Sequence, residues 1–405
     1  MNILFVTWDG PQSTYLEGLF LPIFKKLKKA GYNFCILQFT WANDEILHLR
    51  KEACAEAGFS YIPVSVQRRP VALGSFITAI TGYRHIRSAI DKHNIDIVLP
   101  RSNLPALSTL LALRGRDTRL LFDADGLPLD ERIDFTGLSP SSPIYRILRD
   151  IESQAVRQAD AVITRSHKAS EILLARAGSG TSKDKFHVVT NGRNPELFNP
   201  GTTKSRASMR ISLGIKPDTP LIVYTGSIGP QYCVSEMLRL FGLVLEQRAD
   251  THFLALTGSP QLMQDQLISN PNLAKQITIK SVASDEVPAY LACADLGLAF
   301  RQPSFSMQAV APIKLGEYLL CGLPLVATKG IGDTHIINEK VGLIVENMGK
   351  EELQGVADWF VEKVLPLRED MRDSCRNIGL KSFSLETSSE KYKEAILKTL
   401  EGKHG

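Results

Sequence analysis

The sequence predicts an α/β protein built from two doubly wound domains. A chain of 405 residues is too long for one hydrophobic core and suits two domains of about 200 residues each. Each half begins with an uninterrupted apolar run, residues 2–7 and 220–224, of the kind that forms a buried parallel strand. A glycine-containing loop and a helical pattern follow each run, which is the βαβ opening of a doubly wound sheet.

The composition is that of an ordinary globular protein, with 44% hydrophobic and 22% charged residues. A net charge of +4 is too small to indicate nucleic-acid binding. The six cysteines are scattered without metal-ligand spacing, which favours reduced thiols in a cytoplasmic protein. The N-terminus reads as a strand and no apolar run reaches membrane-spanning length, so any contact with the inner face of the cytoplasmic membrane would be peripheral.

Basic residues gather in the first half of the chain. They are Lys25, Lys26, Lys28 and Lys29, followed by Arg68, Arg69, Arg84 and Arg87. A solvated helix surface is the favoured interpretation. The alternative is a basic surface that meets anionic lipid or a lipid-diphosphate acceptor.

Two loops of the first half are expected at the carboxyl ends of strands, where open α/β sheets bind their ligands. One loop, residues 8–13, leads into a helix expected over 14–30 and contains a single glycine, Gly10, so a dinucleotide cofactor is not expected. The other loop, residues 124–132, follows the strand predicted at 119–123 and is strongly polar.

In the second half, Gly226, Ser227 and Gly229 follow the first strand. With a helix expected to begin near Pro230, they would form a backbone cradle for phosphate.

Residues 311–328 carry the strongest functional pattern. Pro312 is suited to begin a helix, and Lys314 and Glu317 lie three residues apart in its first turns. A helix N-terminus with a lysine favours phosphate, and a carboxylate can accept two hydroxyls of a diol, so the set suits a nucleotide. The alternative is an ordinary αβ unit with a surface Lys–Glu pair.

This stretch resembles the nucleotide-sugar site of GT-B glycosyltransferases, in particular retaining family 4. Three other segments resemble family patterns: residues 123–132, 190–198 and 287–300. The loop at 123–132 resembles that of a subset acting in bacterial surface-polysaccharide assembly. The resemblance implies two Rossmann-like domains facing across a cleft. The implied boundaries are 1–195 for the acceptor-side domain, 196–385 for the nucleotide-sugar domain, and 386–405 for a terminal helix that packs back on the first.

The resemblance also implies site residues. Glu317 would hold the ribose hydroxyls and Lys314 would lie near the diphosphate. The other donor-site candidates are Gly226, Ser227, Gly229, Ser281, Val282 and Leu315. The candidates for the acceptor or sugar side are Gly10, Gln12, Asp123, Asp125, Glu131 and Arg132.

Three departures from the family pattern stand out. Gln231 and Tyr232 occupy the region where an Arg and a Lys usually touch the donor diphosphate. Ala309 replaces the first glutamate of E-x₇-E, and Asp125 stands where the polysaccharide subset has an arginine. A departing diphosphate needs positive charge, and the expected substitutes are Arg193, Arg301 and Lys314.

The function implied is transfer of a sugar from a nucleoside-diphosphate donor, UDP or GDP expected, to a hydroxyl of a glycan or glycolipid, with retention. No metal motif, cofactor or nucleic-acid partner is expected. Two alternatives stay open. One is a nucleotide-sugar epimerase on the same fold. The other is a non-catalytic subunit that binds a nucleotide sugar or a glycan.

Overall fold

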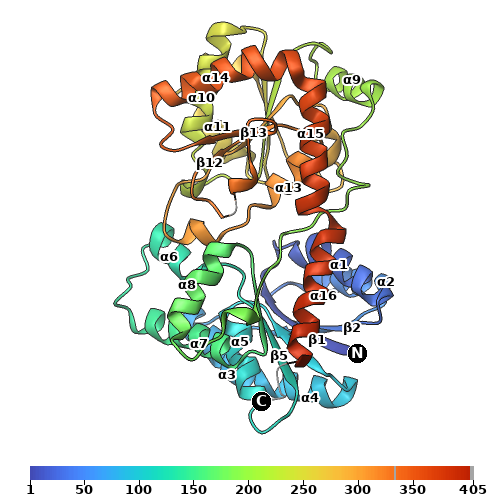
Figure 1. The fold of residues 1–405 in the computed structure, drawn as a ribbon. Helices are drawn as coiled ribbons and strands as arrows, with labels where there is room; N and C mark the ends of the chain where they lie inside the picture. Colours follow the sequence, from blue (N-terminus) through green and yellow to red (C-terminus); the bar gives the residue numbers. More distant parts are fainter. Residues whose placement is uncertain (333, 402–405) are drawn as a thin grey trace. The chain divides into compact units, whose positions relative to one another are not determined.

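The computed structural model describes residues 1–332 and 334–401, which form two compact units (Figure 1). Unit 1 contains residues 1–190 together with the chain from Ser388 onward, and unit 2 contains Asn191–Thr387. The chain thus passes into unit 2 after Thr190. The boundary predicted from the sequence lay five residues later, after residue 195. It returns to unit 1 at Ser388, close to the predicted start of the terminal segment.

Unit 1 is organised around a seven-stranded parallel sheet in the order β3-β2-β1-β4-β5-β6-β7. Its strands are β1 (Asn2–Asp9), β2 (Asn33–Thr40), β3 (Ser60–Ser65), β4 (Ile97–Pro100), β5 (Arg119–Asp123), β6 (Ala161–Thr164) and β7 (Phe186–Val188). The order reverses direction between β1 and β4. Because crossovers are right-handed, the helices of the two halves lie on opposite faces of the sheet.

Nine α-helices lie wholly or mainly in the described part of unit 1. They are α1 (Leu21–Lys29), α2 (Asp44–Glu56), α3 (Val71–Thr81), α4 (Tyr83–His93), α5 (Asn103–Ala112), α6 (Pro128–Thr136), α7 (Pro143–Gln158), α8 (His167–Ala177) and α16 (Leu385–Glu401). The helix expected over 14–30 is not uniform. A π-helical turn at Leu16–Phe20 precedes α1, and Pro22 lies in the first turn of α1.

Unit 2 is built on a six-stranded parallel sheet in the order β10-β9-β8-β11-β12-β13. Its strands are β8 (Leu221–Thr225), β9 (His252–Leu256), β10 (Ile277–Lys280), β11 (Leu296–Ala299), β12 (Leu325–Thr328) and β13 (Gly342–Val345). Its α-helices are α9 (Thr203–Ser212), α10 (Val234–Gln247), α11 (Pro260–Leu267), α12 (Val287–Ala292), α13 (Ile313–Leu320), α14 (Lys350–Trp359) and α15 (Leu365–Phe383).

The core of unit 2 follows the two-residue period of its strands. In β8, Ile222 and Tyr224 belong to the cluster beneath α10 and α14, whereas Leu221 and Val223 belong to the cluster beneath α13 and α15. Both faces of the sheet are therefore covered, which explains the uninterrupted apolar run in the sequence. The α/β fold class predicted from the sequence is confirmed.

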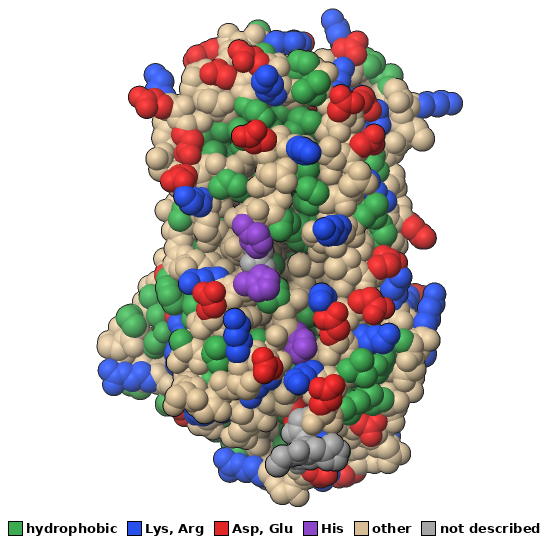
Figure 2. Space-filling view, viewed as in Figure 1, with side chains coloured by type: hydrophobic (Ala, Val, Ile, Leu, Met, Phe, Trp, Pro, Cys, Tyr) green, Lys and Arg blue, Asp and Glu red, His purple; other side chains and the backbone are tan. Residues whose placement is uncertain are grey.

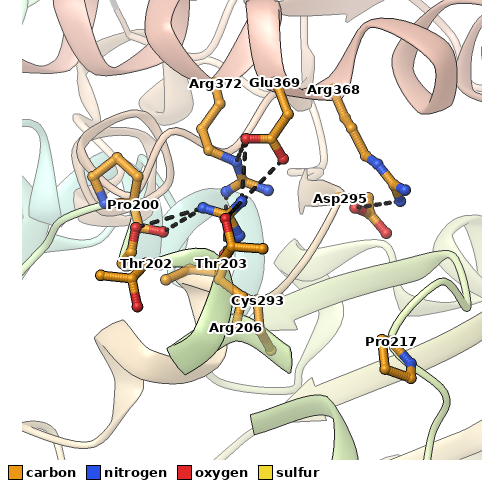
Figure 3. A network of polar contacts seen from close by, with 12 residues as sticks. Pro200, Thr202, Thr203, Arg206, Pro217, Cys293, Asp295, Arg368, Glu369 and Arg372 are labelled. Atoms are coloured by element: carbon orange, nitrogen blue, oxygen red, sulfur yellow. Dashed lines mark hydrogen bonds and ion pairs between the residues drawn. The ribbon is translucent and has the colours of Figure 1, made fainter. Parts of the chain in front are cut away.

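An ion-pair network fastens α9 and α15 to the amino ends of β8 and β11 (Figure 3). Asp295 Oδ2 lies 2.8 Å from Arg210 Nη2 and also accepts the backbone N–H of Leu221. Asp295 Oδ1 lies 3.8 Å from Arg368 of α15, and Arg206 of α9 pairs with Glu369 at 3.0 Å. This network lies at the amino ends of the strands and leaves their carboxyl ends to the loops described below.

The surface carries charges of both signs. In the view of Figure 2, Lys and Arg side chains are interspersed with Asp and Glu over both units. No helix among the described residues combines the length and apolarity that a membrane crossing requires.

Candidate functional site

The two central strands of unit 2, β8 and β11, mark the point where the strand order reverses. Loops from the carboxyl ends of these two strands separate at such a point and leave a crevice that binds ligands. The loop after β8 begins at Gly226, and the loop after β11 carries Arg301 and leads to α13. The candidate site is built from these three segments.

Lys314 lies in the first turn of α13 with its side chain buried inside unit 2 (8% exposed). Its Nζ has no hydrogen-bond partner among the described residues and lies 4.1 Å from the centroid of the Tyr224 ring. Burial lowers the pKa of this amine well below its usual range, the Arg301 charge lowers it further, and Glu317 opposes both. A buried amine without a partner favours the binding of an anion.

Arg301 supplies a second cation beside Lys314. Its guanidinium carbon lies 4.6 Å from the centroid of the Tyr232 ring, and Lys314 Nζ lies 5.6 Å from the same centroid. Arg301 makes no ion pair with a described carboxylate, and its buried Nε has no hydrogen-bond partner there. Tyr232 therefore holds the Arg301 guanidinium by cation–π contact, in the region where the family pattern has its own cations.

The glycine loop after β8 closes over Lys314. Gly226 has a φ of +137°, and a Cβ atom placed on it would lie 3.1 Å from Lys314 Nζ. The Tyr224 hydroxyl donates to the Ser227 carbonyl at 2.5 Å and so fixes the loop above the amine. A side chain at position 226 would block access to Lys314, which explains why a glycine occupies this position.

The helix expected near Pro230 begins later. Pro230–Tyr232 forms only a short 3₁₀ turn after Gly229, and α10 starts at Val234 after Cys233 in the left-handed conformation. The helix expected near Pro230 is thus present there only as one 3₁₀ turn, and the α-helix begins four residues later. Instead, the turn presents the Tyr232 ring to Arg301.

Glu317 lies three residues beyond Lys314 on α13, but the two do not form the surface pair of the alternative interpretation. Glu317 Oε1 lies 2.8 Å from Arg193 Nη2, and both side chains are largely buried, with 12% and 14% exposed. Arg193 is itself fixed by its backbone, which bonds Phe383 and Leu385, and by contact with the Phe198 ring. The structure thus places Arg193 beside the carboxylate and Arg301 beside Lys314.

The remaining donor-side candidates lie around this centre. Leu315 is buried in the core beneath α13 and contributes its backbone to the helix N-terminus. Ser281 is exposed just after β10, and Val282 packs partly against the same core. Ala309 is fully buried in a 3₁₀ turn before α13, so its methyl group fills core space.

In unit 1, the structure brings Asp123 and Asp125 into one charged cluster at the carboxyl ends of β4, β5 and β6. Asp123 is fully buried and pairs with Arg165, and Tyr392 of α16 donates to the same carboxylate at 3.3 Å. Asp125 has a φ of +52° and pairs with Arg101 at 2.5 Å. Arg101 follows β4 directly, and Arg301 lies two residues beyond the end of β11.

The other acceptor-side candidates are more dispersed. A Cβ atom on Gly10 would lie 2.6 Å from the Trp41 ring, and the Gly10 carbonyl accepts a bond from Arg50 at 2.9 Å. Gln12 is exposed in the same loop. Glu131 and Arg132 lie in α6, and Arg132 is exposed.

Sequence reasoning did not select Arg101, Asn103 or Arg165 as site residues. Arg101 contacts the rings of Tyr15 and Phe20 besides its pair with Asp125. Asn103, in the first turn of α5, is buried with both side-chain polar atoms lacking a described partner. Arg101 and Asn103 lie within three residues of the end of β4, beside the point where the strand order of unit 1 reverses. Ligands bind at such a point, so this position could have identified both residues.

Within residues 1–332 and 334–401, no group of three or more His, Cys, Asp and Glu side chains is placed to hold a metal ion. All six cysteines are buried free thiols.

Comparison with known families covers most of the chain. Residues 23–197 match the model of Glycosyltransferase Family 4, and residues 205–378 match that of Glycosyl transferases group 1. The chain belongs to the GT4-like glycosyltransferases with the GT-B fold.

Individual relatives are distant in sequence and close in fold. A glycosyltransferase from Rickettsia africae ESF-5 is 19% identical and superposes with a TM-score of 0.76 over 100% of both chains. HepE of Anabaena, solved in complex with UDP-glucose, is 16% identical with a TM-score of 0.71, over 98% of this chain and 99% of that one.

A curated relative in sequence is the D-inositol 3-phosphate glycosyltransferase of Jonesia denitrificans. It is 24% identical over 237 residues, which are 56% of this chain and 54% of the relative. The chain spans about half the length of the curated relatives it matches.

Proposed function

We propose that the protein transfers a sugar from a nucleoside-diphosphate sugar to a hydroxyl of a glycan or glycolipid acceptor, in the synthesis of bacterial surface polysaccharide or glycolipid. The observation that carries this proposal is the buried, unpartnered Lys314 amine beside Arg301, with Glu317 on the same helix. Two cations and a carboxylate at this spacing complement the diphosphate and the ribose diol of a nucleotide. UDP or GDP is the nucleotide expected.

The same residues account for the chemistry of the step. The bond between the sugar C1 and the diphosphate oxygen breaks, and a bond from C1 to the acceptor oxygen forms. Negative charge grows on the departing diphosphate, and Arg301 and Lys314 stabilise it without a metal ion. Retention of configuration, with the acceptor proton passing to the departing phosphate, is the stereochemical course expected.

The test is a transfer assay with UDP-sugars and GDP-sugars and extracted bacterial surface glycans or glycolipids. We expect nucleoside diphosphate to be released together with a glycosylated acceptor. Arg301→Ala should lower turnover about 10²-fold or more, the scale of losing one stabiliser of developing charge. If Arg301→Ala and Arg193→Ala both leave turnover intact, neither residue replaces the missing family cations.

The alternatives give different outcomes in the same assay. An epimerase would convert the donor without any acceptor. A non-catalytic subunit would bind the nucleotide without turnover of any donor. A glycolipid acceptor would also require contact with the inner face of the cytoplasmic membrane.

A further inference from the structure

Helix α3 exposes aliphatic side chains instead of burying them. Its eleven residues include no charged side chain, and Leu73, Ile77 and Ile80 are 56%, 40% and 41% exposed. These three positions follow i, i+4, i+7 spacing and form one stripe along the helix. Val71, at the start of α3, is 53% exposed. A monomer rarely leaves such a stripe to water without a partner.

Helix α7 also exposes aliphatic side chains. The first turns of α7 expose Ile144 and Ile147, 51% and 47% respectively. Phe76 of α3 and Tyr145 of α7 are partly buried in the same small core cluster, and both helices pack on α5 (Figure 1). The exposed side chains therefore lie on neighbouring helices and define the α3–α7 patch: Val71, Leu73, Ile77, Ile80, Ile144 and Ile147.

The chain around α3 is positively charged without any acidic residue. Residues 57–90 contain no Asp or Glu and four arginines: Arg68, Arg69, Arg84 and Arg87. The chain has 47 basic and 43 acidic residues, so its net charge of +4 equals the charge of this segment. Arg68, Arg69 and Arg84 are exposed and make no ion pair with a described carboxylate.

Aromatic side chains accompany the arginines at both ends of α3. Before the helix, the Arg68 guanidinium lies 4.3 Å from the centroid of the Trp41 ring, which is 38% exposed. After it, the Arg84 and Arg87 guanidinium groups lie 5.8 and 5.6 Å from the Tyr83 ring. Trp and Tyr rings with basic groups favour the headgroup level of a bilayer, and the aliphatic stripe favours the acyl boundary beneath it.

We propose that the α3–α7 patch is a docking surface for an anionic lipid bilayer. The aliphatic side chains would enter the boundary between headgroups and acyl chains, and the exposed Arg68, Arg69 and Arg84 would pair with lipid phosphates. This inference goes beyond the proposed transfer reaction, because the patch belongs to unit 1 and the donor-side residues belong to unit 2.

The positive charge of residues 57–90 favours a bilayer over a second copy of the chain as the partner of the α3–α7 patch. A symmetric dimer through this patch would bring the four arginines of each copy together without an acidic residue from residues 57–90. Like charges in such an interface oppose association, whereas anionic headgroups neutralise them.

Co-sedimentation of the full chain with lipid vesicles tests the proposal. We expect binding to vesicles of phosphatidylcholine mixed with phosphatidylglycerol, and weaker binding to phosphatidylcholine alone or at high salt. Leu73→Gln/Ile77→Gln should weaken binding about tenfold or more, because both side chains lose apolar burial. Arg68→Gln/Arg69→Gln should weaken it about fivefold for each arginine removed.

Ile211→Gln is the matched control, because Ile211 is 64% exposed on α9 in unit 2. It should bind vesicles like the wild type. Thermal unfolding and nucleotide binding of each variant show whether the fold and the donor site are intact, so failure of the proposed transfer function is recognised separately. Absence of binding to anionic vesicles overturns the proposal, as does equal binding by Leu73→Gln/Ile77→Gln. A wild-type dimer that this double variant dissociates would assign the patch to self-association instead.

Discussion

Glu317, the residue proposed to hold the ribose, forms an ion pair with Arg193. The two side chains meet at 2.8 Å with little exposure. The Arg193 guanidinium therefore offsets the cost of burying the charged Glu317 carboxylate. In the proposed function the same carboxylate also accepts the ribose hydroxyls. Arg193 orients Glu317 and does not need to touch the diphosphate.

Replacing Arg193 with leucine should destabilise unit 2. The Glu317 carboxylate would keep its burial and lose its charge-assisted partner, so the free energy of unfolding should fall by about 1–3 kcal/mol. Chemical denaturation at neutral pH measures this change. Arg193→Lys, which keeps the charge, should retain part of the stability. Equal stability of Arg193→Leu and the wild type would show that the pair contributes little.

The lowered pKa of Lys314 predicts proton uptake on nucleotide binding. Burial disfavours the charged amine in the free protein, whereas a bound diphosphate favours it, so binding raises the pKa. Affinity should therefore be highest below the free-state pKa and decline as pH rises above it. Calorimetric titrations in buffers of different ionisation enthalpy count the protons taken up. Lys314→Met should bind more weakly and remove this uptake, and unchanged uptake would contradict the assignment.

At the residue scale, local spacing predicted some site residues but not their partners. Lys314 and Glu317 share one helix, so their proximity follows from helical geometry. The Arg193–Glu317 and Arg301–Tyr232 contacts join segments distant in sequence, and only the folded chain brings them together. The burial of Lys314 was also not predictable, because lysine is almost never fully buried.

Helix α13 is positioned by close packing on both of its sides. The Tyr318 hydroxyl accepts the backbone N–H of Thr225 in β8 and donates to the Leu298 carbonyl in β11. A Cβ atom on Gly297 would lie 2.5 Å from the Tyr318 ring, and one on Gly316 would lie 2.8 Å from Phe383 Cβ. These contacts set the position of the first turn, which carries Lys314.

Gly297→Ala should therefore destabilise unit 2 by about 1–3 kcal/mol, the range for overpacking a core. The added methyl group would displace the Tyr318 ring, so nucleotide affinity should fall as well. Denaturation curves and calorimetry measure the two effects. Gly355→Ala is the matched control, because Gly355 is exposed in α14 with no atom within 4 Å of an added Cβ, and alanine there should be neutral or stabilising. Wild-type stability in Gly297→Ala would show that α13 tolerates movement.

Element prediction succeeded where the apolar pattern was long and failed at irregular turns. The continuous runs of β1 and β8 identified buried parallel strands, because both faces of each sheet are covered. The π-helical turn before α1 and the 3₁₀ turn at Pro230 were missed. Both are short backbone irregularities, and they leave no periodic pattern of apolar residues in the sequence from which they could be predicted.

For the whole molecule, length and pattern were sufficient to predict two doubly wound units. The strand orders of both sheets reverse next to the first strand of the unit, β1 or β8, and an arginine follows the neighbouring strand in each case. The net charge gave no functional indication by itself, but residues 57–90 around α3 carry four arginines and no acidic residue. Sequence reasoning noted these arginines but could not reveal that α3 leaves its aliphatic residues exposed.

The measurement to make first is calorimetric titration of UDP and of GDP, without added metal, into the wild type, Glu317→Ala and Glu339→Ala. Glu339 is an exposed glutamate of unit 2 and serves as the control. We predict that one nucleotide binds the wild type and Glu339→Ala alike. Glu317→Ala should lose about 1.5–3 kcal/mol of binding free energy, the range for a hydrogen bond to a charged group. Equal affinity in Glu317→Ala, or no binding of either nucleotide to the wild type, would contradict the donor site proposed for unit 2.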